Sequence, residues 1–158
     1  MKFNTKTIHG GQQPEKTTGA VMPPVFLTST FAQSSPGEHK GYGYARGTNP
    51  TRTALEKSFA AIENGTHGFA FASGMAAIDC VLRLLKPGDE VVAGDDLYGG
   101  TYRMFTQLFQ KYGLEFSFVD MDVVENVSAV ITKKTKLVWI ETPTSPLMKI
   151  ADISAISS

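Results

Sequence analysis

The sequence predicts an α/β fold with a mostly parallel sheet, preceded by an extended N-terminal arm. From residue 49 onward, short apolar runs of strand length alternate with stretches whose apolar residues recur at helical spacing. Segments rich in glycine and proline separate these runs and mark turns. The alternation indicates a parallel sheet, because consecutive parallel strands need a crossover connection that is usually a helix.

Residues 1–48 are predicted to form the extended arm. They show neither helical nor strand periodicity, and Pro23-Pro24 and Pro36-Gly37 interrupt regular structure. Their apolar residues include Val25, Phe26, Leu27, Phe31, Tyr42 and Tyr44. This apolar content is high for a disordered tail, which is the alternative. We therefore expect the arm to lie on the rest of the fold or on a neighbouring subunit.

The first helix of the α/β region is predicted to begin at Asn49, a favourable N-cap, with Pro50 at its first position. It ends near Gly65. A short apolar strand at 68–72 then leads directly into a second helix. The apolar face of that helix carries Ile78, Leu82 and Leu85.

Three further strands are predicted, with helices between them. The expected strands are 90–93, 115–119 and 136–141, and the expected helices are 100–111 and 123–131. Residues 152–158 begin a helix with no stop signal, so we expect the sequence to end within a domain.

Chemically distinctive residues follow the predicted strand ends, where ligands bind in open parallel sheets. Ser73-Gly74-Met75 opens a helix, and the free N–H groups and dipole of such an N-terminus suit a phosphate. An ordinary tight turn is the alternative there. Tyr98, followed by two glycines, can stack on a flat ligand, or can be a plain core or rim tyrosine. A rigid loop with free hydroxyls, 142–146, follows the last strand.

The arm contributes a second candidate, Tyr44 with Arg46, on backbone bounded by glycines. Arginine binds phosphate through a bidentate fork and tyrosine can add a phenol donor. A solvated surface arginine is the alternative. No Walker A motif is present, and the three histidines lack metal-ligand spacing, so no metal is predicted.

The composition excludes some classes of partner. Fifteen basic residues balance fifteen acidic ones in the 158 residues, which predicts no attraction to nucleic acid or to a membrane surface. No apolar run is long enough to span a bilayer. The single cysteine, Cys80, excludes an internal disulfide and is expected of a cytoplasmic protein.

Several segments together resemble one family. They are Ile8-His-Gly-Gly11, Tyr44-Ala-Arg46, Asn49-Pro-Thr-Arg52, Ala72-Ser-Gly-Met-Ala-Ala77, Asp96-Leu-Tyr-Gly-Gly100 and Glu141-Thr-Pro-Thr with Pro146. Their order and spacing resemble the N-terminal part of the pyridoxal 5′-phosphate (PLP)-dependent enzymes of cysteine and methionine metabolism, the trans-sulfuration family. The resemblance implies that residues 1–48 contact another subunit and that 49–158 are the first part of a PLP-binding domain like that of aspartate aminotransferase.

The resemblance also assigns roles to single residues. It implies that the backbone N–H groups of Gly74 and Met75 bind the cofactor phosphate. Tyr98 is expected to stack on the pyridine ring and to take part in proton transfer. Tyr44 and Arg46 are expected to contact the phosphate in a neighbouring subunit's site.

Ser145 departs from the family pattern, which usually has asparagine there to reach the phenolic oxygen of the pyridine ring. Serine can also donate a hydrogen bond, but it is shorter, so a water could bridge the gap. We expect Ser145 to take this place. The family's Schiff-base lysine comes in a later segment, so residues 1–158 alone are expected to be inactive.

The resemblance predicts a homotetrameric enzyme that acts on cystathionine or a related sulfur amino acid by γ-elimination or γ-replacement, as cystathionine γ-lyase or γ-synthase does. A cystathionine β-lyase or methionine γ-lyase activity is the alternative. A non-catalytic truncated subunit, which binds only phosphate, PLP or partner subunits, is an alternative of another class.

Overall fold

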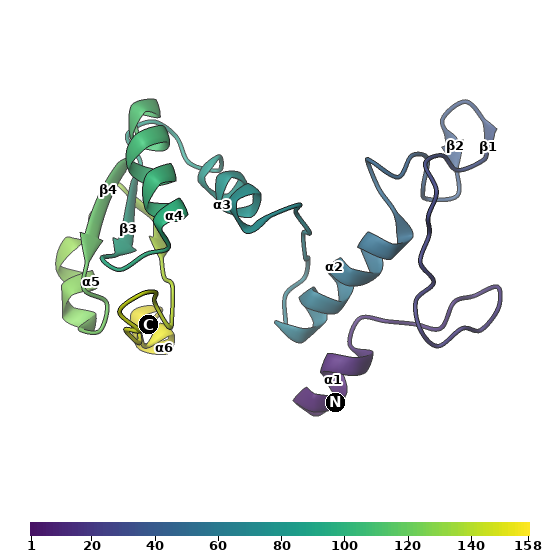
Figure 1. Cartoon of the computed structure of the whole chain (residues 1–158), viewed down its shortest axis with the longest axis horizontal. Coiled ribbons are helices and arrows are strands. Elements are labelled where there is room, and N and C mark those ends of the chain that lie inside the picture. The colour runs from purple at the N-terminus through teal and green to yellow at the C-terminus, as the bar shows by residue number, and fades with distance from the viewer. The chain divides into compact units, whose positions relative to one another are not determined.

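The computed structural model describes all 158 residues, which form two compact units, Met1–Ala70 and Phe71–Ser158 (Figure 1). Each unit is described by itself below. No helix is both long enough and apolar enough to cross a membrane.

The first unit contains two helices and a small antiparallel hairpin. Their bounds are α1 Phe3–His9, β1 Gln33–Ser35, β2 Glu38–His39 and α2 Pro50–Ile62. Neither α1 nor the hairpin was predicted from the sequence, which indicated an arm without regular structure. The chain after α1 packs closely on α2, where a Cβ on Gly11 would lie 2.2 Å from the carbonyl oxygen of Lys57. This tertiary packing supports a helix too short to persist by itself.

The predicted start of α2 is confirmed, and it also holds part of the arm. Asn49 caps the helix, since its Oδ1 accepts a hydrogen bond of 2.8 Å from the backbone N–H of Thr51. The Asn49 amide donates to the carbonyl of Phe26 (3.1 Å), and the Phe26 N–H donates to Thr51 Oγ1 (2.9 Å). The arm therefore has a fixed attachment to the first turn of α2.

The predicted strand at 68–72 is wrong. This segment is extended but has no strand beside it, and a strand exists only where a neighbour supplies its ladder hydrogen bonds. Its first half is bound to α2 instead. Ala70 N–H donates to Glu56 Oε1 (3.0 Å), and a Cβ on Gly68 would lie 2.3 Å from the Glu56 carbonyl oxygen.

The second unit confirms the predicted parallel α/β architecture. The strands β3 Glu90–Gly94, β4 Glu115–Val119 and β5 Thr135–Trp139 form a parallel sheet in the order β4-β3-β5. The helices are α3 Gly74–Leu82, α4 Gly99–Arg103, α5 Val124–Val130 and α6 Ile153–Ile156. A π-helical turn, Met104–Leu108, and a 3₁₀ turn, Phe109–Tyr112, continue α4 to Gly113.

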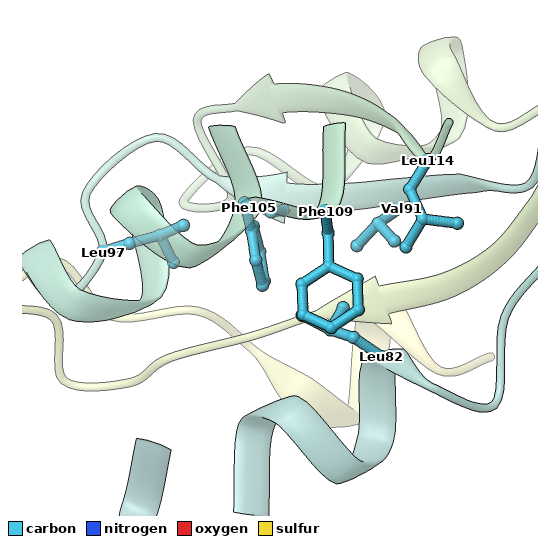
Figure 2. Close-up of a cluster of buried hydrophobic side chains, with 7 residues drawn as sticks. Leu82, Val91, Leu97, Phe105, Phe109 and Leu114 are labelled. Atoms are coloured by element: carbon cyan, nitrogen blue, oxygen red, sulfur yellow. The ribbon is translucent and has the colours of Figure 1, made fainter. Parts of the chain in front are cut away.

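The central strand β3 separates two apolar cores. On one face, Val91 and Ala93 pack with Leu82 of α3 and with Phe105 and Phe109 of the segment after α4. Figure 2 shows Leu82, Val91, Phe105 and Phe109 converging in this core. On the other face, Val92 packs with residues of α5 and α6. β3 is buried on both faces, as its continuous apolar sequence predicts.

Glu90 ties together the amino ends of the strands, at the sheet edge opposite the strand-end loops. It is 8% exposed and accepts hydrogen bonds from Thr135 Oγ1 (2.7 Å), Ser117 Oγ (2.8 Å) and Thr132 Oγ1 (2.9 Å). These hydroxyl donors, that of Thr135 first, hold the pKa of the Glu90 carboxyl below its usual value.

Glu90→Gln is expected to lower the free energy of unfolding of the full-length protein by about 1–3 kcal/mol at pH 7, because an amide presents one acceptor oxygen instead of two. The folded-state pKa is depressed, so the charge contributes stability above the unfolded value of about 4.3 and loses it as pH falls through the folded value. Urea denaturation at pH 7 and pH 4 should therefore show a smaller difference between variant and wild type at pH 4.

Glu115→Gln is the matched control, since this exposed carboxylate begins β4 and pairs only with the exposed Lys134. It should change the free energy of unfolding by less than about 1 kcal/mol. Equal losses for the two variants at pH 7 would contradict the role given to Glu90.

Candidate functional site

The carboxyl ends of β3 and β5 and the start of α3 all belong to the second unit, and the candidate site is built from them. Parallel strands end at the same edge of their sheet, so the loops 95–98 and 140–152 both leave from that edge. Side-chain hydrogen bonds between these loops hold the site in shape.

The first turn of α3 offers free backbone donors. Ser73 caps the helix by accepting a hydrogen bond from Ala76 N–H at its Oγ (3.2 Å), and the first backbone bond runs from Ala77 N–H to the Ser73 carbonyl. The N–H groups of Gly74 and Met75 precede these bonds and have no partner. Gly74 is exposed, and no atom lies within 4 Å of a Cβ built on it.

Tyr98 presents an aromatic ring next to α3. The side chain is 58% exposed and makes no hydrogen bond of its own. A Cβ added to Gly100 would lie 2.3 Å from Tyr98 Cε1 and 2.8 Å from Met75 Sδ. The ring and the thioether therefore meet over Gly100, where only glycine leaves room. Two residues singled out from the sequence, Met75 and Tyr98, are thus brought together.

An open groove of about 390 Å³ borders this contact. Its lining includes Met75, Tyr98, Gly100, Arg103 and Met104. Tyr98 is therefore both exposed and part of the groove wall.

Glu141, which follows β5, entered the sequence analysis only as the first residue of one family-like segment, and its contacts with Tyr98 and Thr101 were not predicted. Its Oε2 accepts a hydrogen bond from the backbone N–H of Tyr98 (2.7 Å). Its Oε1 accepts from Thr101 Oγ1 (2.8 Å) and from the indole N–H of Trp139 (3.1 Å). A single glutamate at a strand end carries no sequence signal for partners about forty residues away.

The loop that carries Ser145 is fixed by its neighbours, while Ser145 itself is free. Asp96, which is 8% exposed, accepts a hydrogen bond of 2.9 Å from Leu147 N–H, and Thr144 exchanges hydrogen bonds with the backbone of Lys149. Ser145 is exposed and its hydroxyl has no partner, so it is available to a ligand.

Lys149 joins the same loop to two strand ends. Its ammonium group lies 2.8 Å from Asp95 Oδ2 and 3.1 Å from Asp120 Oδ2, beyond β3 and β4 respectively. The hydrogen bonds to Asp95 and Asp120 raise the pKa of Lys149. The pKa of Asp120 is lowered, first by the backbone N–H of Asp122 and then by Lys149. The amine is therefore charged at neutral pH and engaged in structure.

Tyr44 and Arg46 lie in the first unit and form a pair of their own. The guanidinium carbon of Arg46 lies 5.0 Å from the centroid of the Tyr44 ring, a cation–π arrangement. Both side chains are exposed, and Arg46 has neither a carboxylate partner nor a hydrogen bond. Its guanidinium therefore keeps all its donors free for an anion.

The fold and this arrangement define an α/β protein with a candidate site for a phosphorylated aromatic ligand. Free N–H groups at a helix N-terminus suit the phosphate, and the exposed ring of Tyr98 suits the flat part of such a ligand. The chain belongs to the family of Cys/Met metabolism PLP-dependent enzymes, whose model matches residues 4–158. The predicted resemblance is thereby confirmed, and with it the PLP dependence of the family.

The similar proteins are named for different reactions. The chain is 51% identical over 155 residues to a probable cystathionine gamma-synthase of Herpetosiphon aurantiacus, covering 98% of this chain and 49% of the relative. It is 52% identical over 156 residues to a cystathionine beta-lyase of Coxiella burnetii, covering 98% and 40% respectively.

A solved structure, cystathionine gamma-lyase from Lactobacillus plantarum complexed with L-serine, aligns with a TM-score of 0.90 and 46% identity. The alignment covers 99% of this chain and 41% of that one. The chain therefore spans less than half the length of the relatives it matches, and its fold is that of their matched part.

Proposed function

We propose that the full-length protein is a PLP-dependent enzyme of sulfur amino acid metabolism that acts on cystathionine or a related substrate by γ-elimination or γ-replacement. The observation that carries this proposal is the meeting of Tyr98 and Met75 over Gly100, beside the free N–H groups of α3. A β-lyase or methionine γ-lyase reaction is the second candidate, since the beta-lyase relative is as similar as the gamma-synthase.

The residues of this chain fit PLP by their donor chemistry. The N–H groups of Gly74 and Met75, aided by the α3 dipole, would hold the phosphate. The ring of Tyr98 would cover one face of the pyridine, and its phenol would exchange a proton with the substrate. Ser145 would donate to the phenolic oxygen of the pyridine, directly or through a water. The chemistry that PLP supplies when bound is storage of the electrons left when Cα loses a proton.

The arm is proposed to complete a neighbouring subunit's site within a homotetramer. Arg46 and Tyr44 are exposed, and Arg46 has no internal anion to bind. Residues 1–48 also expose large apolar side chains, with Leu27 at 94% and Met22 at 72%. Exposed apolar surface of this kind marks contact regions between chains. We propose that 49–158 form the first part of the PLP-binding domain.

Residues 1–158 by themselves are proposed to lack activity. PLP enzymes use a neutral lysine amine to bind the cofactor covalently. Lys149 lies between Asp95 and Asp120, and its raised pKa keeps it charged. Cys80 is free, which fits the proposed cytoplasmic location.

The reaction can be tested by incubating the full-length protein with cystathionine and separating cysteine from homocysteine. Cysteine as the product supports γ-elimination, and cystathionine formed from cysteine and an activated homoserine ester supports γ-replacement. Homocysteine would favour the β-lyase instead. If neither product forms and the protein shows no PLP absorbance, the remaining explanation is that the protein is a non-catalytic subunit.

Arg46→Ala is expected to weaken PLP binding by the full-length protein about tenfold, because a charge-assisted phosphate contact is lost. Mixing Arg46→Ala subunits with Tyr98→Ala subunits tests whether the sites are shared. In a mixed dimer with shared sites, one of the two sites receives both intact residues, so activity should exceed the sum of the two separate variants.

Arg83→Ala is the matched control, since Arg83 is exposed and paired with Asp79 on α3. It should leave PLP affinity unchanged. If the mixture gains no activity although mixed assemblies form, Arg46 serves its own subunit and the shared site is wrong.

A further inference from the structure

We propose that Glu141 is the residue that positions Tyr98 for stacking on the cofactor, an inference that rests on the proposed function. The carboxylate follows the end of β5, whereas Tyr98 immediately precedes α4, at its N-cap position. Glu141 is the side chain that connects these two places directly through hydrogen bonds.

Both oxygens of the carboxylate accept hydrogen bonds, and two of the three donors belong to the start of α4. Its Oε2 receives the N–H of Tyr98 at 2.7 Å, and its Oε1 receives the Thr101 hydroxyl at 2.8 Å. The indole N–H of Trp139 adds a bond of 3.1 Å to Oε1. Thr101 is fully buried (0% exposed), so this end of the network is rigidly placed.

The position of the Tyr98 ring depends on this backbone anchor. The ring makes no hydrogen bond and is 58% exposed, so few contacts of its own restrain it. Its close neighbours are Gly100 and the thioether of Met75. With the Tyr98 N–H fixed by Glu141, the ring lies over Gly100 beside the free donors of α3. Without that bond, the backbone N–H of Tyr98 would lose its acceptor at the end of β5.

A glutamine cannot replace Glu141 fully, because three donors face its two oxygens. In one orientation the glutamine NH₂ meets the Tyr98 N–H, a donor that cannot rotate. In the other orientation the amide oxygen still accepts from Tyr98, but the Trp139 indole N–H loses its acceptor and the Thr101 hydroxyl must turn to accept instead of donate. Two donors lose their acceptor in this second orientation and only one in the first, so the first is favoured while the indole N–H is present. Removing the indole N–H takes away one of these two losses and therefore shifts the glutamine toward the second orientation, in which Tyr98 keeps its acceptor.

This predicts a rescue that a general loss of stability would not produce. Glu141→Gln should weaken PLP binding by the full-length apoprotein about tenfold. The double variant Glu141→Gln/Trp139→Phe should recover most of that loss of affinity. Trp139→Phe alone completes the double-mutant cycle and is the reference for the double variant. Glu125→Gln, an exposed carboxylate on α5, is the control and should stay within about twofold.

Crystal structures of the apoproteins give a readout that does not depend on the cofactor. In Glu141→Gln the Tyr98 ring should leave its place over Gly100, and in the double variant it should return. A ring that stays in place in Glu141→Gln, or a double variant that fails to restore it, overturns the proposal. If the ring behaves as expected but the wild type binds no PLP, the proposed function is wrong and the positioning role stands.

Discussion

Replacing Tyr98 with alanine is expected to weaken PLP binding by the full-length protein roughly tenfold to a hundredfold, and to lower kcat as well. Stacking of a flat heteroaromatic ring on an aromatic side chain contributes about 1–3 kcal/mol. The Tyr98 ring is 58% exposed and lies over Gly100 without a hydrogen bond, so it is free to make that contact. Spectroscopic titration of the apoprotein with PLP measures the loss.

Two further variants separate stacking from proton transfer at this position. Tyr98→Phe keeps the ring and removes the phenol, so it should retain PLP affinity while kcat falls. Tyr102→Ala removes another half-exposed aromatic ring, which packs on Phe118 instead of facing the groove, and should change PLP affinity little. Unchanged affinity in Tyr98→Ala would refute the stacking role.

Phe105→Ala is expected to reduce the free energy of unfolding by about 3–5 kcal/mol, the usual cost of deleting a fully buried phenylalanine. Phe105 is 0% exposed. Its ring stacks on Phe116 at 4.7 Å between centroids and meets Trp139 edge-on at 5.7 Å. The substitution leaves a cavity between the segment after α4 and the sheet, which urea denaturation of the full-length apoprotein should report.

Tyr112→Ala is the control for this measurement. Tyr112 ends the 3₁₀ turn of the same helical segment, but it is 66% exposed. Its loss should cost less than about 1 kcal/mol. Similar losses for Phe105→Ala and Tyr112→Ala would mean that the segment contributes through helix formation instead of through packing on the sheet.

Elements with local signals could be predicted from the sequence. Asn49 and Ser73 cap their helices through their own side chains, and these bonds span two or three residues. The continuous apolar run of β3 depends only on its burial by both cores. These causes lie within a few residues or in the composition of one segment. They can therefore be recognised in the sequence alone.

Features with distant causes could not be predicted. The run 68–72 has strand composition, but a strand also needs a neighbour, and Glu56 binds Ala70 instead. The helix α1 depends on close packing against α2. The role of Glu141 depends on Tyr98 and Thr101, which approach it only through the fold.

The candidate site showed the same division. The sequence singled out four candidate residues because they follow predicted strands or begin a helix: Gly74, Met75, Tyr98 and Ser145. Their mutual arrangement could not be predicted, because it depends on Gly100 leaving room for a ring and on carboxylates that join separate loops. The binding roles of all these residues remain predictions: Tyr44, Arg46, Gly74, Met75, Tyr98 and Ser145.

The bonds between loops limit how this protein can be re-engineered. Segment 142–149 is held by Asp96 at Leu147 and by Asp95 and Asp120 at Lys149. A loop transplanted from a relative with a different reaction would keep its shape only where the recipient offers the same anchors. Changing the reaction by loop exchange would thus require moving segments 95–100 and 141–149 together, with Asp120 kept or moved with them.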